Sequence, residues 1–298
     1  MSHFCVLVIG ENVEEQLAPY CESDEQFTVF QPTGQEAFEK FKQEYPDSYK
    51  NYLEGYEEYK KECETNGDQA LNLIDHWAED WHGAQIHPTD ESLGFGYFTN
   101  PNAKWDWYEI GGRWSGFFKV KAGTNGQKFG QYFHGAPETA TDYADIVSIE
   151  NWDITGLREE TRQNAEQFYD KLEGVLKGRQ LPSWSEILEN NSNDITLARN
   201  EYHSNEVMMD LRAAEIYCFG DLREEFKNSR QEYVDSMVEA AGVPFSVVKD
   251  GTWYQKGEMG WFGMSHNEKE ENSWNKEFWS ILSSLPPDTT LTLVDCHI

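Results

Sequence analysis

The chain has 298 residues, of which 38% are hydrophobic and 14% aromatic, and its 54 acidic and 24 basic side chains give a formal net charge of −30. A chain of this length can bury a full core, and its aromatic content is typical of a folded protein. The negative field disfavours direct binding to nucleic acid and to anionic membranes, because both depend on Lys and Arg near phosphates. It favours basic partners, although solubility alone is a simpler explanation of the same charge.

The cysteines and the first residues indicate a cytoplasmic protein. The five cysteines are scattered, odd in number and form no CxxC pair, which is typical of free thiols in a reducing compartment. The apolar run 4–9 follows no basic region and is too short for a signal peptide or a membrane span. No other window reaches the ~18 apolar residues of a membrane helix. We therefore expect a soluble protein without a membrane partner.

The first third of the chain predicts a strand followed by helices. Residues 4–9 are apolar and β-branched, as in a buried central strand. Over 35–63, aromatic residues recur every three or four positions, which predicts a helical stripe that Pro46 breaks into two helices. A further helix is expected over 68–81, with Asp68 as its N-cap. The stripe is either a helix face packed on a core or a partner-binding face.

His76, His82 and His87 lie among acidic residues and raise the possibility of a metal-dependent hydrolase. His76 and His82 are six residues apart, which puts them on opposite sides of a helix, whereas metal-binding pairs are three or four apart. Surface or capping histidines are therefore the better interpretation. We expect no metal site and no cofactor.

The central segment 100–121 is the most aromatic stretch of the chain. Two aromatic runs flank Gly111 and Gly112 and predict a β-hairpin, because a type I′ turn needs positive φ at both central residues. In the predicted register Glu109 faces Trp114, Trp107 faces Gly116 and Trp105 faces Phe118. The hairpin is expected to belong to the core.

The remaining chain predicts helices and then a second hairpin. Long helices are expected over 157–177, 194–217 and 221–241, and Ser183 has the form of a capping box that opens a short helix. A hairpin is expected over 245–256, because Asp-Gly between apolar runs is a strong turn signal. A last helix and a strand over 290–296 follow.

These elements predict an α+β fold, with a mixed or antiparallel sheet from both termini and the two hairpins, and with helical insertions forming a cover or a second lobe. The expected parts are 1–150, an α+β part with the central aromatic hairpin; 151–244, a helical block; and 245–298, which completes the sheet. If the helices project, their aromatic stripes need a partner, which implies a homo-oligomer.

Catalytic residues are not expected. Asp295, Cys296 and His297 are adjacent, but on a strand Cys296 points away from the other two, so the three cannot form a relay. Nucleophile-elbow, zinc-protease, phosphate-loop and calcium-loop motifs are lacking. The sequence therefore indicates a protein that is not an enzyme.

The aromatic residues also suggest a binder or sponge for a nucleotide-like ligand. Three indoles beside Arg113 would stack on such a ligand and clamp it with one charge. Core packing of the indoles, with Arg113 paired to Glu109 or Asp106, is the alternative. The candidate binding residues are Trp105, Trp107, Tyr108, Arg113, Trp114 and Trp261.

Four stretches of the chain are distinctive as strings: MSHFCVLVIGENVEEQLAPY, NPNAKWDWYEIGGRWSGF, GEMGWFG and LPPDTTLTLVDCHI. In these stretches the chain resembles a family of bacteriophage- and prophage-encoded proteins, most of which have no assigned activity. By size, acidity and phage origin, the chain also resembles anti-defence proteins that inhibit the Gabija system by binding and caging its nuclease complex. The resemblance implies a non-enzymatic inhibitor in the host bacterial cytoplasm. Its acidic surface would screen the basic, DNA-binding surface of a host defence complex.

Overall fold

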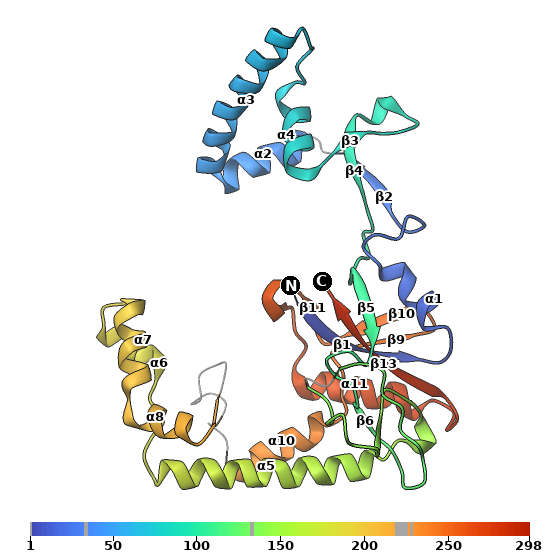
Figure 1. Ribbon diagram of the computed structural model, residues 1–298, viewed down its shortest axis with the longest axis vertical. Coiled ribbons are helices and arrows are strands. Elements are labelled where there is room, and N and C mark those ends of the chain that lie inside the picture. Colours follow the sequence, from blue (N-terminus) through green and yellow to red (C-terminus); the bar gives the residue numbers. More distant parts are fainter. Residues whose placement is uncertain (1, 33–34, 132–133, 218–225, 227–228) are drawn as a thin grey trace. The chain divides into compact units, whose positions relative to one another are not determined.

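The computed structural model describes residues 2–32, 35–131, 134–217, 226 and 229–298 (Figure 1). Its strands form several sheets, the largest of which is mixed, and its helices lie between them in the sequence, which confirms the predicted α+β class. No helix among these residues is both long enough and apolar enough to cross a membrane.

Contacts divide the chain into two units. The first consists of 12–108 with 296–298, and the second of 2–11 with 109–295. Each unit combines segments that are far apart in the sequence. This division differs from the three consecutive parts expected from the sequence.

The largest sheet has the strand order β10-β9-β1-β13-β5, and β8 also pairs with β13. β1 is parallel to β9, while the β9–β10 and β13–β8 pairs are antiparallel. The first and last strands therefore belong to one sheet, as predicted, and are neighbours in it, and both are buried along most of their length. The bounds are β1 (His3–Ile9), β5 (Trp107–Ile110), β8 (Ile146–Ser148), β9 (Ser246–Lys249), β10 (Thr252–Gln255) and β13 (Thr290–His297).

The second predicted hairpin is confirmed as the β9–β10 pair. Its turn residues Asp250 and Gly251 have positive φ angles of 51° and 70°. A type I′ turn requires positive φ at both of these positions. In the resulting register Trp253 lies opposite Val248.

The first predicted hairpin is wrong. Gly111 and Gly112 do have positive φ angles, of 72° and 46°. β5, however, lies beside β13, and β6 (Phe118–Lys119) pairs with β7 (Tyr143–Ala144). The cross-strand register predicted for Trp105–Phe118 and its neighbours is therefore also wrong. The turn leads the chain away from β5, because distant side chains take up its backbone N–H groups, as described below.

The helices of the second unit follow the predicted pattern with two exceptions. The expected helix over 194–217 is two helices, because Asn205 has extended backbone and caps the second one by accepting a hydrogen bond from the Val207 N–H at 2.9 Å. The helix expected over 221–241 begins only at Arg230, because Ser229 has extended backbone and caps it by accepting from the Glu232 N–H. Residues 221–225, 227 and 228 lie outside the described residues. The bounds are α5 (Ile154–Leu176), α6 (Trp184–Asn190), α7 (Ile195–Ser204), α8 (Glu206–Ala213), α10 (Arg230–Ala240) and α11 (Glu271–Ser283).

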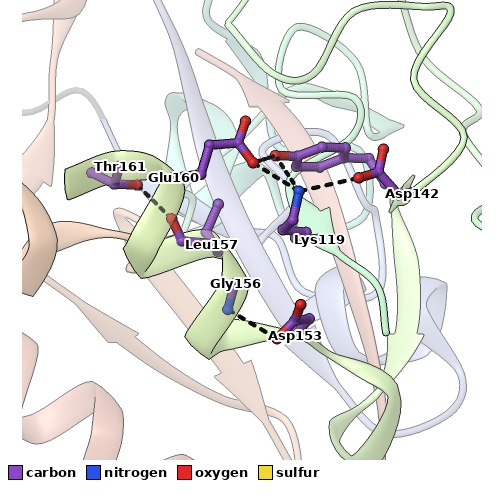
Figure 2. A network of polar contacts seen from close by, with 8 residues as sticks. Lys119, Asp142, Asp153, Gly156, Leu157, Glu160 and Thr161 are labelled. Atoms are coloured by element: carbon purple, nitrogen blue, oxygen red, sulfur yellow. Dashed lines mark hydrogen bonds and ion pairs between the residues drawn. The ribbon is translucent and has the colours of Figure 1, made fainter. Parts of the chain in front are cut away.

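Side-chain caps begin two of the helices in this unit, and the one at Ser183 was predicted. Ser183 caps α6 by accepting from the Glu186 N–H at 3.2 Å. Asp153 caps α5 by accepting from the Gly156 N–H at 2.9 Å (Figure 2). The buried core of this unit includes Leu7, Phe118, Val247, Trp274, Phe278 and Leu293. The short elements are η3 (Ile149–Asn151), β11 (Glu258–Met259), η4 (Trp261–Gly263) and β12 (Ser265–His266).

The first unit contains the aromatic helices. Pro46 occupies the first turn of α3 and separates it from α2, as predicted. α4 begins later than expected, because Asn72 rather than Asp68 is its N-cap and accepts from the Ile74 and Asp75 N–H groups. The bounds are α1 (Val13–Leu17), η1 (Ala18–Tyr20), β2 (Val29–Pro32), α2 (Gln35–Glu44), α3 (Pro46–Asn66), α4 (Leu73–His82), β3 (Gln85–Ile86), η2 (Glu91–Leu93) and β4 (Phe95–Thr99).

The aromatic stripe of these helices is a core. Its buried members pack on one another across α2, α3 and α4, which favours the packing interpretation over a partner-binding face. They are Phe38, Phe41, Tyr52, Tyr56 and Trp77. The strands β2, β4 and β3 form a separate three-stranded sheet in that order.

Candidate functional site

The Gly111–Gly112 turn is organised by a buried carboxylate from another part of the chain. Asp145 is 0% exposed and accepts hydrogen bonds from the Ser115 hydroxyl at 2.9 Å and the Phe129 N–H at 2.6 Å. It also accepts from the Gly116 N–H. A side chain on Gly111 would collide with this carboxylate. Residues just after the turn and the backbone at Phe129 therefore donate to the same carboxylate.

A second buried carboxylate comes from β13. Asp295 is 1% exposed, accepts from the Arg113 N–H at 3.0 Å and pairs with His3 Nδ1 at 2.9 Å. A side chain on Gly112 would collide with Asp295. Both glycines are thus needed for their positive φ and for the close approach of a carboxylate. Asp145 and His3 were not among the predicted site residues, and the one local signal was an aspartate at the start of an apolar strand.

These carboxylates are suited to holding the fold. Their oxygens already accept several donors, and a buried carboxylate satisfied in this way is a structural anchor. The nearby Cys5 is not activated, because burial raises the pKa of its thiol to about 11 and keeps it protonated near neutral pH.

Asp295, Cys296 and His297 do not act together. Asp295 pairs with His3, whereas His297 Nδ1 pairs with Asp106 Oδ1 at 2.6 Å. Cys296 is fully buried. The side chains alternate along β13 as expected for a strand.

The predicted ligand-binding residues of the first unit have different surroundings. Trp105 is 8% exposed and donates its indole N–H to the Leu17 carbonyl at 3.2 Å, and Tyr108 lies edge-on to it with 5.3 Å between ring centroids. Trp107 is exposed and stacks on His297 at 5.2 Å. Trp105 is therefore a core residue. The imidazole of His297 already covers one face of the Trp107 ring.

The remaining predicted residues belong to the second unit. Arg113 is exposed, and Trp114 is half-buried against the main core with His134 at 5.5 Å. Asp106, an expected partner of Arg113, is bonded to His297 instead. The side chain of Trp261 lies outside the described residues.

Trp114 also lines a cavity of about 410 Å³ beside a network of charged groups. Lys119 Nζ lies 2.7 Å from Glu160 and 3.1 Å from Asp142, and the Tyr143 hydroxyl donates to Glu160 at 2.7 Å (Figure 2). Burial raises the pKa of Tyr143 to about 12, and the hydrogen bond from Lys119 lowers the pKa of Asp142. Near neutral pH these groups keep fixed protonation states, so the network holds α5 to the β6–β7 pair.

The histidines considered as metal ligands are used in hydrogen bonds. His76 Nδ1 bonds to the Tyr52 hydroxyl at 2.6 Å, and His87 Nδ1 accepts from the Asp90 N–H at 3.0 Å. The side chain of His82 is not described. Among the described residues, no group of three or more His, Cys, Asp or Glu side chains is arranged to hold a metal ion.

The three-stranded sheet of the first unit exposes large apolar side chains. Phe95 of β4 packs on the helical core. Phe98 is three residues further along the strand, so its side chain lies on the other face. Phe98 is 53% exposed and lies opposite Phe30 of β2, with 5.3 Å between ring centroids. We call this surface the open face, formed by Phe30, Pro32, Gln85 and Phe98.

Further exposed apolar residues lie on the same small sheet, outside the open face. Val29, Ile86 and Tyr97 are exposed on the face that carries Phe95, and Leu93 is exposed in the adjoining η2. Exposed apolar residues are common singly, but their concentration on one small sheet is typical of an interaction surface. Of the surfaces described, this one is the strongest candidate for binding another protein.

Comparison with known proteins does not place the chain in a family, since no family model, curated protein or solved structure matches it.

Proposed function

We propose that the chain is a phage-encoded, non-enzymatic inhibitor that binds a host protein complex in the bacterial cytoplasm. Its partner would be an anti-phage defence nuclease of the Gabija type, whose basic DNA-binding surface it screens. The observation that best supports this proposal is the open face, where Phe98 is 53% exposed on a chain of net charge −30.

The two features have complementary effects on binding. Aromatic side chains at the centre of an interface supply affinity when they are buried by a partner. The net negative charge of the chain would speed encounter with a basic surface and disfavour acidic competitors. A DNA-binding face is positively charged, so it matches this surface better than an average protein surface does. The proposal includes self-association of the chain, which would allow it to enclose its target.

The proposal is tested by co-purification from infected cells with matched variants. The wild-type chain should retain one host nuclease complex, and raising the salt concentration should weaken the interaction. Phe98→Ser should lose the complex, whereas Met209→Ser, which changes a side chain of similar exposure (56%) on α8, should retain it.

The purified components then test the inhibition itself. The chain should prevent the isolated nuclease from binding duplex DNA, and Phe98→Ser should not. Light scattering measures the mass of the free chain and of the complex. If Phe98→Ser inhibits as well as the wild type, the open face is not the interface. If the wild type leaves DNA binding intact, the proposed screening is wrong.

A further inference from the structure

A second cavity in the second unit is lined by several residues that carry nitrogen donors. It has a volume of about 610 Å³ and is lined by residues of α5, α10 and α11. Its lining residues include Arg158, Asn275 and Trp279, and also Glu239, Lys276 and Ser280. None of these residues takes part in the open face or in the Gly111–Gly112 turn.

Three residues that line this cavity each carry a buried side-chain N–H group with no acceptor within the described part of the chain. The groups are Arg158 Nε, Asn275 Nδ2 and Trp279 Nε1. Only six buried side-chain nitrogen or oxygen atoms of the described residues have no partner, so half of them belong to residues that line one cavity. Folded proteins leave few buried polar groups unpaired, because such groups give up their hydrogen bonds to water. All three groups are donors, so they share a need for an acceptor.

The positive charge of Arg158 also favours a ligand with a negatively charged group. Arg158 forms no ion pair with any described residue, although acidic side chains outnumber basic ones by 54 to 24. Arg162, one turn further along α5, lies 3.7 Å from Asp235 and 3.9 Å from Glu159. An arginine that forms no ion pair with a described carboxylate in so acidic a chain keeps its charge available for a ligand.

Stacking holds Arg158 in place. Its guanidinium carbon lies 4.5 Å from the ring centroid of Trp279, and Trp279 stacks on the buried Trp152 at 5.8 Å. A stacked guanidinium has a fixed plane, so its hydrogen bonds have a fixed direction. Lys276, which is exposed at the rim, adds a second positive charge.

We infer that this cavity binds a small ligand through an oxyanion, either a carboxylate or a phosphate. The oxyanion would accept hydrogen bonds from Arg158 and Asn275, and an aromatic or apolar part of the ligand would lie against Trp279. Glu239 and Ser280 supply acceptors for a hydroxyl or amino group on the same ligand. This inference does not depend on the proposed inhibitor function.

Three probes with the same ring test the inference by isothermal titration calorimetry. Phenyl phosphate and phenylacetate carry an oxyanion and distinguish phosphate from carboxylate, and phenethylamine carries a cation. At least one of the two anions should bind saturably, and phenethylamine should bind at least about tenfold more weakly, as expected for loss of a charge-assisted contact. Equal binding of all three probes, or no saturable binding of either anion, would overturn the inference.

Matched variants locate the site. Arg158→Gln should weaken the better anion by at least about tenfold, whereas Arg162→Gln should leave its affinity unchanged. Trp279→Phe keeps an aromatic ring, removes one N–H donor and should weaken binding several-fold, which provides a test if Arg158→Gln does not fold. Circular dichroism checks the fold of each variant. Unchanged binding by a folded Arg158→Gln or Trp279→Phe variant would contradict the assignment.

Discussion

Asp295 accepts a hydrogen bond from the backbone N–H of Arg113 at 3.0 Å, although the two residues are 182 positions apart in the sequence. This bond connects the last strand to the central aromatic segment. The close approach of Asp295 also explains why residue 112 is a glycine, since a Cβ there would occupy the space of Asp295. The motif that dominates the sequence is therefore a structural junction between distant parts of the chain.

We expect Gly112→Ala to be strongly destabilising. Alanine at φ 46° costs about 1 kcal/mol, and the collision with Asp295 adds roughly 1–3 kcal/mol. Gly123→Ala is the control, because Gly123 also has positive φ but no heavy atom lies near its added Cβ. Urea unfolding measures both variants. Equal losses would show that backbone strain, and not the approach of Asp295, determines the effect.

Asp145→Asn should also destabilise the fold. The buried carboxylate accepts from the Ser115 hydroxyl and the Phe129 N–H, and an amide would present an NH₂ group to some of these donors. We expect a loss of about 3 kcal/mol in the free energy of unfolding. Asp288→Asn, at an exposed position, should change it by less than about 0.5 kcal/mol. A small effect at Asp145 would mean that the amide satisfies the same donors.

Local signals predicted the elements that depend on neighbouring residues. Pro46 separates α2 from α3, and Asp250–Gly251 forms the turn of β9–β10, because both effects arise from backbone chemistry within a few residues. The two terminal strands were predicted for the same reason, since continuous apolar runs are buried in sheet interiors.

Long-range contacts determine what could not be predicted. Gly111–Gly112 has the turn conformation expected of it, but Asp145 and Asp295, which are distant in sequence, decide where the chain goes next. Likewise, Asn275 and Trp279 are four apart on one helix, but nothing local indicates that Arg158 joins them. Periodicity predicts which residues share a face, not which distant residue meets that face.

The Lys119 network should make stability depend on pH in the acid range. The hydrogen bond from Lys119 lowers the pKa of Asp142 below its usual 3.8. Burial would raise the pKa of Glu160, but hydrogen bonds from Lys119 and Tyr143 outweigh it and lower the pKa below the usual 4.5. Because both pKa values are lower in the folded state, this stabilisation is present above about pH 4.5 and is lost as pH falls through the folded-state values.

Lys119→Met tests this pH dependence. Thermal unfolding at a series of pH values should show a shallower loss of stability on acidification than in the wild type. Lys121→Met is the control, since Lys121 donates to the Glu150 carbonyl at 2.6 Å, which does not titrate. A slope unchanged by Lys119→Met would place the acid sensitivity elsewhere.

Phe278 and Phe98 should respond differently to truncation. Phe278 is 0% exposed in the main core, so Phe278→Ala should cost about 3–5 kcal/mol. Phe98 is 53% exposed, so Phe98→Ala should cost less than about 1 kcal/mol in the isolated chain. Urea unfolding of the two variants compares them directly. A large loss at Phe98 would mean that the open face is covered within the free protein, which would weaken its proposed role in binding.

The sign of charge at the open face should control association with a basic partner. Gln85 is exposed and lies opposite Gly96, two residues from Phe98 on the same face, so its substitution changes charge without removing an aromatic contact. Gln85→Lys should slow association with the purified nuclease, and Gln85→Glu should speed it, because opposite charges steer encounter. Stopped-flow association at low salt measures both rates, and high salt should bring them together. Gln163→Lys on α5 makes the same change of charge in the other unit and should have a smaller effect. If Gln85→Lys and Gln85→Glu associate at the same rate at low salt, charge does not guide the partner to this face, and the screening of a DNA-binding surface needs another contact.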